Sequence, residues 1–265
     1  MRLFSSATEA AGEVERDLWE MGHRNVTNSY QDKVGEFETR ELVPYQFTLV
    51  DWQGIEDFKD ALLKLGFSMK EAYKAMAYAE EEVKTRMQFG WNWGELVGSY
   101  IENFSKLNPG HAYKVRSEVW DKFLEENGRF SYTYPERFLA YFGTEERGTY
   151  NQLQHLTNTY AKDNGSRQLI LSMYDPNQDN VRVHQKRRIP CTMYYQFLKR
   201  GEKLIMIHNM RSCDLYTHFP IDMAISWRMI EETIKAWGGD LKPQLVMQMG
   251  SLHAFKSDME KKRIF

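Results

Sequence analysis

The 265-residue sequence lacks several features that would assign it at once to a class of protein. It has only two cysteines, Cys191 and Cys213, too few for a disulfide framework or a four-thiolate metal site, so a reducing compartment is the simpler interpretation. Lys and Arg total 35 against 37 Asp and Glu, which gives no overall positive field for coating nucleic acid. Any site for an anion must therefore be local.

Long uncharged runs are missing as well. No segment approaches the roughly 18 apolar residues that a membrane-spanning helix needs, and the first apolar run stops after Phe4, without the core of a secretory signal. These patterns predict a cytoplasmic protein with no membrane contact. Residues 175–180 (DPNQDN) begin like a calcium loop, but Asn180 replaces the required glycine, which predicts a turn. With no zinc spacing either, we expect no metal.

The residue pattern predicts that the first part of the chain is largely helical. Hydrophobic residues make up 42% of the sequence, enough for one substantial core, and the absence of repeats or long linkers predicts a single domain over 1–265. A short strand is expected at 41–50. Apolar residues then recur at helical spacing, which predicts helices at 55–65, 69–87, 93–107, 115–126 and 150–162.

In the later part of the chain, the pattern changes from one typical of helices to one typical of strands. Residues 167–174 have strand composition, and 191–212 form two apolar and aromatic runs joined at Gly201, which predicts a β-hairpin. A helix beginning near Asp222 and ending before Gly238 precedes a last strand at 244–255. Because the strands cluster late and do not alternate with helices, the order predicts an α+β fold with a mixed or antiparallel sheet packed by helices.

Cys191 is the strongest candidate for chemistry. It stands at the start of a predicted strand, shortly after Arg187 and Arg188, and one hairpin away from Arg211. Cations favour the thiolate, which is the nucleophilic form of a cysteine. A cysteine on a strand is also commonly a small buried apolar residue. The residues alone leave both interpretations open.

Three segments, PCTMYYQF, NMRSCD and GSLHAF, resemble the thymidylate synthase superfamily in order and spacing, and are most similar to the deoxycytidylate hydroxymethylases of T-even-like phages. The resemblance is specific over 128–255. It implies a thymidylate synthase-like fold and a sheet-mediated homodimer. The matching residues are Cys191, Gln196, Arg211, Ser212, Asp214, Pro220 and His253.

Departures from the synthase pattern favour the hydroxymethylase branch. Thr192 follows the cysteine where synthases have histidine, and Met210 replaces a glutamine. Asp222 stands where synthases carry the asparagine that reads the pyrimidine edge. Cytosine offers an amino donor and a ring-nitrogen acceptor, and a protonated carboxyl group can complement both. Asp222 therefore favours a cytosine nucleotide, although aspartate is also an ordinary helix N-cap.

The resemblance implies nucleophilic catalysis with 5,10-methylenetetrahydrofolate as co-substrate. The Cys191 thiolate adds to C6 of the pyrimidine, and C5 then attacks the one-carbon unit. Loss of the C5 proton and of tetrahydrofolate leaves an exocyclic methylene group. Addition of water to this group gives 5-hydroxymethyl-dCMP, whereas a synthase would add hydride.

A local cationic site for the nucleotide phosphate is also implied. Arg211 and Ser212 would bind the phosphate directly, since a guanidinium suits phosphate oxygens. The family adds a serine-arginine-arginine motif from the partner subunit, for which this sequence supplies Arg167 but has Gln168 in the second place. Lys33 could take the place of an N-terminal phosphate residue, although a solvated surface charge is its plainer interpretation.

The resemblance assigns five further positions. They are Gln196 and His253 for the nucleotide, Tyr134 near the cysteine, and Trp120 and Asp214 for the folate. The family usually has a tyrosine two residues after the late histidine, where this chain has Phe255, so CMP stays open as a substrate.

The general acid/base glutamate is assigned to Glu82, because Tyr78 precedes it by four residues as an aromatic residue does in the phage enzymes. Glu81 and Glu95 are alternatives. A run of carboxylates on a helix is commonly a solvated face.

Three functions remain open at the level of the sequence. The first is a dCMP hydroxymethylase, acting in a host cytoplasm if a phage encodes it. The second is a dUMP or CMP hydroxymethylase or a thymidylate synthase. The third is a catalytically idle homologue that serves as a binding protein. None of them binds nucleic acid directly.

Overall fold

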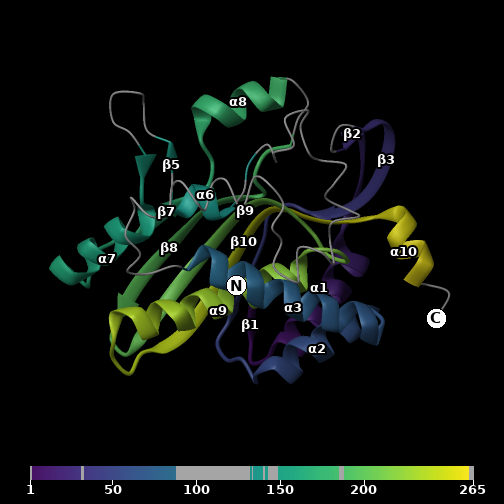
Figure 1. The fold of residues 1–265 in the computed structure, drawn as a ribbon. Helices are drawn as coiled ribbons and strands as arrows, with labels where there is room; N and C mark the ends of the chain where they lie inside the picture. The colour runs from purple at the N-terminus through teal and green to yellow at the C-terminus, as the bar shows by residue number, and fades with distance from the viewer. Residues whose placement is uncertain are drawn as a thin grey trace.

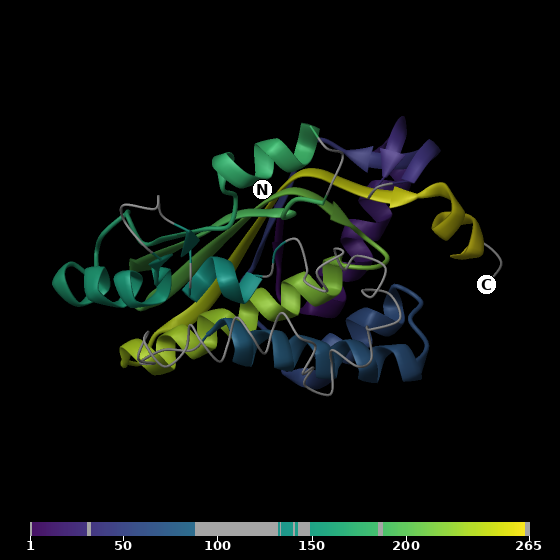
Figure 2. The same ribbon diagram turned by 45° about the horizontal axis from the view of Figure 1, so that its top comes forward.

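The computed structural model describes residues 2–30, 33–87, 132, 134–139, 141–142, 149–184 and 188–262. In these residues a mixed β-sheet lies at the centre, and α1, α2, α3 and α9 cover one of its faces (Figures 1 and 2). The helices are α1 (Ala7–Met21), α2 (Ile55–Lys64), α3 (Met69–Arg86), α6 (Tyr134–Leu139), α7 (Gln152–Lys162), α8 (Pro176–His184), α9 (Phe219–Trp237) and α10 (Lys256–Lys262). The expected α+β class is confirmed.

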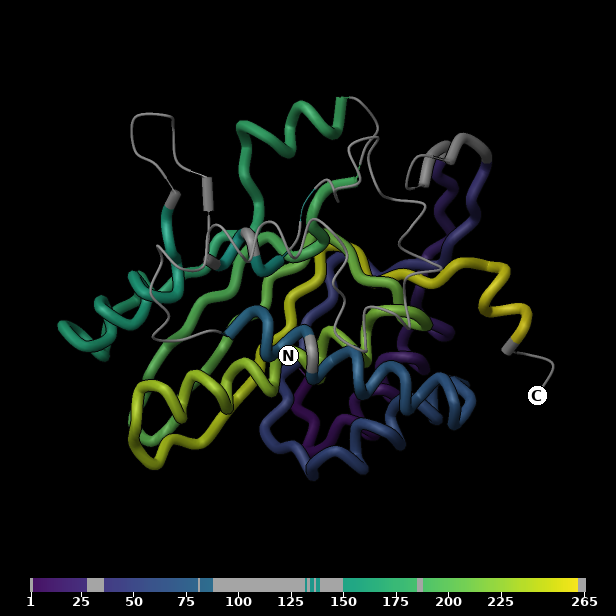
Figure 3. Tube along the Cα trace, in the orientation of Figure 1, coloured from purple at the N-terminus to yellow at the C-terminus, as the bar shows by residue number. Residues whose placement is uncertain are grey.

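The main sheet has the order β1-β4-β10-β9-β8-β7, with β3 joining β10 and β2 joining β3. β10 is parallel to β9, whereas β8 is antiparallel to both β9 and β7. Segments distant in sequence thus run side by side through the middle of the molecule (Figure 3). The strands of this sheet are β1 (Arg2–Phe4), β2 (His23–Tyr30), β3 (Lys33–Leu42), β4 (Tyr45–Leu49), β7 (Ile170–Ser172), β8 (Thr192–Arg200), β9 (Lys203–Asp214) and β10 (Lys242–Phe255), and β5 (Tyr141–Phe142) pairs separately with β6 (Thr149–Tyr150).

The predicted β8–β9 hairpin is confirmed, with Gly201 in the turn. Gly201 has φ of 56°, a left-handed conformation that glycine adopts without steric cost. Along β9, Leu204, Met206, His208 and Met210 are buried, and the residues between them are less so. This period of two places one side of the strand under the helices.

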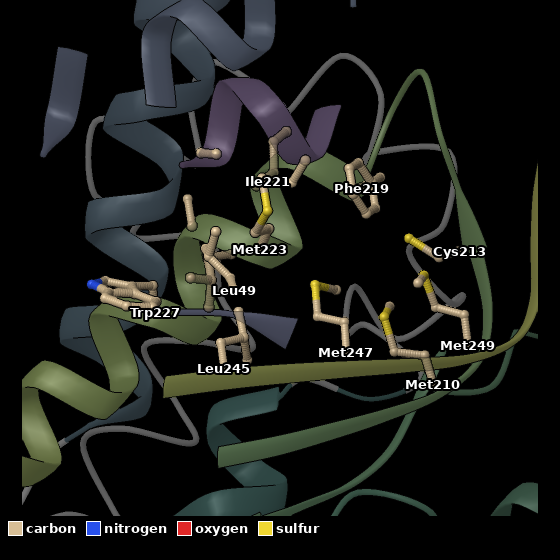
Figure 4. Close-up of a cluster of buried hydrophobic side chains, with 14 of the residues drawn as sticks. Leu49, Met210, Cys213, Phe219, Ile221, Met223, Trp227, Leu245, Met247 and Met249 are labelled. Atoms are coloured by element: carbon tan, nitrogen blue, oxygen red, sulfur yellow. The ribbon is translucent and has the colours of Figure 1, made fainter. Parts of the chain in front are cut away.

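Helix α9 carries the apolar face that its sequence spacing predicts. Met223, Trp227 and Ile230 are buried, and Ile234 and Trp237 pack against the core. Figure 4 shows Met223 and Trp227 on the side of α9 that faces β10 and its buried Leu245 and Met247. Burial of several side chains of this size, at about 1.5–3 kcal/mol each, holds α9 on the sheet.

Several local predictions are wrong or incomplete. The strand expected at 41–50 is divided into the end of β3 and all of β4, around Pro44, whose nitrogen cannot donate a ladder hydrogen bond. The turn expected at 175–180 is the start of α8, where the carboxylate of Asp179 accepts from the N–H of Asp175 at 2.8 Å and ion-pairs with Arg137. The sequence pattern also did not lead us to predict α1 or the β2–β3 hairpin, which the structure contains.

Two further predictions cannot be compared with the structure. The helices expected at 93–107 and 115–126 lie outside the described residues. The assignment of 1–265 to a single domain stays a prediction. In the described part of the chain, no helix combines the length and apolar composition needed to cross a membrane.

Candidate active site

Cys191 lies immediately before β8, half-buried, beside the last residues of β9. The Nη2 atom of Arg211 is 3.7 Å from the Cys191 sulfur, and the Oγ atom of Ser212 is 3.9 Å from it. The N–H of Arg211 donates to the carbonyl of Cys191 at 2.8 Å, which joins the two segments. The hairpin therefore brings together the three residues that the sequence proposed as nucleophile and phosphate ligands.

The Arg211 side chain is exposed but tethered to the segment before the cysteine. Its Nε donates to the carbonyl of Pro190 at 3.0 Å and its Nη2 to that of Ile189 at 3.3 Å, while Nη1 contacts Ser212 Oγ at 3.1 Å. A guanidinium fixed by backbone carbonyls keeps its charge in one place with little remaining loss of side-chain entropy. It can hold an anion beside the Cys191 sulfur.

Tyr134 reaches the same region from α6. Its hydroxyl oxygen accepts from the N–H of Thr192 at 3.3 Å, next to the cysteine. Burial raises the pKa of Tyr134 well above its usual range, and the charge of the nearby Asp222 carboxylate adds to this rise. Tyr134 therefore stays protonated, and the structure places it near the cysteine, where the resemblance expected it.

Glu82 lies on α3 and does not belong to a solvated face. Its side chain is buried and its Oε2 accepts from Nε and Nη2 of Arg86 at 2.9 and 2.5 Å. The guanidinium carbon of Arg86 stands 4.3 Å from the ring centroid of Tyr134, and its Nη1 donates to the hydroxyl of Tyr195 at 3.3 Å. Glu82 is thus connected to the start of β8 through Arg86 and Tyr134. Nothing is described of the Glu81 side chain, and Glu95 lies outside the described residues.

Asp222 lies within the first turn of α9, half-buried. The helix begins at Phe219 with His218 as its N-cap, and the N–H of Asp222 already donates to the carbonyl of His218 at 2.8 Å. The helix therefore starts three residues earlier than its sequence predicts, and Asp222 is not the N-cap. Its carboxylate is close enough to raise the pKa of Tyr195, although burial is the larger cause.

Asp214 and His253 are neighbours across the parallel strands β9 and β10. Burial raises the pKa of Asp214, and hydrogen bonds from Thr217 and from the N–H of Tyr216 partly offset this rise. The His253 ring is half-buried and stands edge-on to Phe255, with centroids 5.6 Å apart. These two side chains continue the polar end of the sheet beyond Ser212.

Two assigned residues, Gln196 and Arg167, lie away from this cluster, and for two others the structure describes no side chain. Gln196 alternates with the buried Tyr195 and Phe197, so it lies on the other face of the sheet, where its Nε2 donates to the carbonyl of Arg167 at 2.8 Å. Arg167 is exposed, and Lys33 begins β3 without a described side chain. Trp120 falls outside the described residues.

Sequence reasoning missed a buried polar group next to the cysteine. His208 hydrogen-bonds to Thr192 Oγ1 and to Ser226 Oγ, at 2.8 Å in each case. The alternation of β9 was a usable signal, because it puts His208 on the same side as Leu204 and Met206. Within the described residues, no group of three or more His, Cys, Asp or Glu side chains could hold a metal ion.

Comparisons with known proteins identify the family and the fold. The family model for thymidylate synthase matches residues 92–264. A thymidylate synthase from Brachyspira hyodysenteriae is 23% identical over 147 residues, 55% of this chain and 53% of that protein, so the match spans about half the length of the relative. The structure of thermostable thymidylate synthase A from Bacillus subtilis is similar with a TM-score of 0.63 at 14% identity, over 98% of this chain and 83% of that one, which confirms the expected fold. The family match covers well over half of the sequence, and the chain belongs to the thymidylate synthase family.

Proposed function

We propose that this protein transfers a one-carbon unit from 5,10-methylenetetrahydrofolate to C5 of dCMP and that addition of water gives 5-hydroxymethyl-dCMP. The observation that carries the proposal is the position of the Cys191 thiol, within 4 Å of both Arg211 and Ser212. A thiol beside a fixed guanidinium can attack C6 of a pyrimidine whose phosphate the same guanidinium holds. The folate, as co-substrate, supplies the one-carbon unit.

Each proposed role follows from the place of the residue. Cys191 forms the bond to C6 and is released when the product is complete. Glu82 acts as the general acid/base in the proton transfers, and its ion pair with Arg86 keeps its carboxylate in one orientation. Tyr134 stays protonated and can donate to an oxygen of the substrate. Asp214, His253 and Arg167 are proposed contacts of the folate, the sugar and the phosphate.

Asp222 is the residue that favours cytosine over uracil. Its partly buried place in the first turn of α9 lets its carboxyl group meet the base edge, where a mismatched pair would leave polar groups unsatisfied. Asp222→Asn should therefore shift the preference from dCMP toward dUMP by about 10- to 100-fold in relative kcat/KM. Competition between the two nucleotides measures this ratio, and an unchanged ratio would refute the role.

The experiment that tests the reaction is a substrate panel. Tritium release from 5-tritiated dCMP, CMP and dUMP is measured with methylenetetrahydrofolate, and product masses distinguish a hydroxymethyl from a methyl group. Cys191→Ala should abolish release, whereas Cys213→Ala, which changes the other cysteine, should retain it. Release by Cys191→Ala would refute the mechanism. Absence of release from every nucleotide with the unmodified protein would favour an idle homologue.

A homodimer through the second face of the sheet also belongs to this proposal. Ile205, Ile207 and Val246 are only half-buried and alternate with residues that pack under the helices. An apolar sheet face of this kind favours burial against a second copy. Sedimentation of the purified chain should give twice the monomer mass, and Ile207→Lys should shift it toward monomer. A monomeric unmodified protein would contradict the dimer.

A further inference from the structure

His208 is a buried histidine whose two ring nitrogens are both occupied. Its Nε2 is 2.8 Å from Thr192 Oγ1 and its Nδ1 is 2.8 Å from Ser226 Oγ. The ring also packs on Tyr195, with centroids 4.4 Å apart. A neutral imidazole offers one donor and one acceptor, and a hydroxyl can take either role, so the three side chains satisfy one another in both tautomers.

The surroundings keep this imidazole neutral. Burial lowers the pKa of His208 to about 3, and the positive charge of nearby Arg86 adds to the effect. Because its nitrogens are both bonded to hydroxyl groups of the protein, the ring does not face the substrate. His208 therefore contributes through the positions of the residues to which it bonds.

The two hydroxyl groups belong to the two elements that carry the proposed chemistry. Thr192 follows Cys191 and begins β8. Ser226 lies one helical turn after Asp222 on α9, and residues four apart share a face of a helix. His208, on β9 between them, connects the strand of the nucleophile with the helix of the base-reading carboxylate.

The backbone alone does not fix Thr192 in this orientation. Residues three apart on a regular strand face opposite sides of a sheet, yet Thr192 and Tyr195 are both buried on the helix side. A register shift between Thr192 and Tyr194 makes this possible and interrupts the ladder with β9. Side-chain bonds to Thr192 therefore add to the backbone bond between Arg211 and Cys191 in holding the irregular start of β8.

We propose that His208 is a positioning residue that sets Cys191 and Asp222 at the separation required for attack on the pyrimidine. The inference rests on the proposed function of the site. It assigns a separate task to each nitrogen: Nε2 orients the cysteine through Thr192, and Nδ1 orients the carboxylate through Ser226.

Two substitutions separate these tasks. The amide group of Asn reaches about as far as Nδ1, so His208→Asn retains the bond to Ser226 and loses the bond to Thr192. The longer Gln reaches about as far as Nε2 and does the reverse. His208→Asn should lower kcat for tritium release by about 10- to 100-fold with KM for dCMP little changed, since an error of about 1 Å in a reacting group has this effect. His208→Gln should retain more of kcat and lose part of the preference for dCMP over dUMP.

A second pair of variants keeps the test valid if the histidine variants fold poorly. Thr192→Val removes the hydroxyl at constant shape and should reproduce the kcat defect of His208→Asn, whereas Thr192→Ser restores the hydroxyl and should recover activity. Thr233→Val is a matched control, because Thr233 is a buried residue of α9 whose hydroxyl bonds within the helix, to the carbonyl of Met229. Its activity per folded molecule should equal that of the unmodified protein.

A readout without turnover distinguishes failure of this inference from failure of the proposed function. In the absence of nucleotide, Thr192→Val should slow alkylation of Cys191 by iodoacetamide severalfold, because the thiol loses its fixed place beside Arg211. If the unmodified protein is inactive with every nucleotide, the proposed function fails, and this alkylation test still decides the positioning role at the cysteine. Unchanged alkylation in Thr192→Val, or equal losses of kcat in the Asn, Gln and Thr233→Val variants, would overturn it.

Discussion

The two cysteines of this chain lie at the same end of the β8–β9 hairpin, away from its turn, and have contrasting surroundings. Cys191 is half-buried at the start of β8, beside the Arg211 guanidinium and Ser212. Cys213, near the end of β9, is 2% exposed. Figure 4 shows its sulfur in a cluster with Met210, Met249 and Phe219.

The contrast shows that the surroundings decide what a thiol can do. Burial raises the pKa of the Cys213 thiol well above its usual range, and the nearby carboxylates of Asp222 and Asp214 add to the rise. Cys213 therefore remains a neutral apolar residue in the core. The region of Cys191 instead provides a cation and a hydroxyl group beside a thiol that is only half-buried.

The most direct way to break this comparison is to label both thiols in the folded protein. Iodoacetamide should modify Cys191 on the order of 100-fold faster than Cys213, because Cys213 becomes accessible only when the core opens. Mass spectrometry of peptides from a time course measures both rates. Comparable rates would show that the two regions do not differ as described, and unfolding in urea should remove the difference.

Removing Arg211 tests the cation that the structure places beside the Cys191 sulfur. Arg211→Ala should weaken binding of dCMP by about 10- to 100-fold, since a charge-assisted contact with phosphate is lost. Calorimetric titration measures this affinity. Arg200→Ala is the control, because Arg200 is an exposed arginine of the same hairpin that bonds to the backbone carbonyls of Gly165 and Lys199. Equal affinities in the two variants would argue against a phosphate site at Arg211.

The smallest expected effect concerns His208, which bonds to Thr192 beside Cys191. Its pKa of about 3 in the folded state compares with 6.5 for an ordinary histidine. Above pH 6.5 its contribution to stability is complete. As the pH falls from 6.5 toward 3, the unfolded chain takes up a proton that the folded chain lacks, so the free energy of unfolding decreases by up to about 1.4 kcal/mol per pH unit.

Urea unfolding at several pH values between 6.5 and 5 measures how the free energy of unfolding depends on pH in the upper part of this range. His208→Asn should reduce the slope, because the titrating group is removed while the carboxylates common to both proteins remain. Equal slopes for the two proteins would contradict a neutral, buried His208.

Much of the fold could be predicted from local pattern. The β8–β9 hairpin, α9 and β10 have strong periodicity and clear end signals, Gly201 and Gly238 among them, and all are present, although α9 begins three residues earlier than predicted. The N-terminal α1 was missed although its buried residues, such as Ala7, Ala11, Val14 and Leu18, recur at helical spacing. The start of α8 was read as a turn because the capping carboxylate of Asp179 and its partner Arg137 are distant in sequence.

The candidate site was likewise predictable from the sequence in part, and the rest depended on the tertiary structure. By itself the sequence determined the order of the elements, the alternation that buries one side of β9, and the residue types at Cys191, Arg211 and Asp222 that carry the family resemblance. Only the tertiary structure decided that Cys191 rather than Cys213 meets the guanidinium, that Glu82 is buried against Arg86, and that His208 joins β8 to α9. The physical reason is that periodicity reports which side of an element is apolar, whereas ion pairs and buried hydrogen bonds depend on which elements the sheet order places side by side.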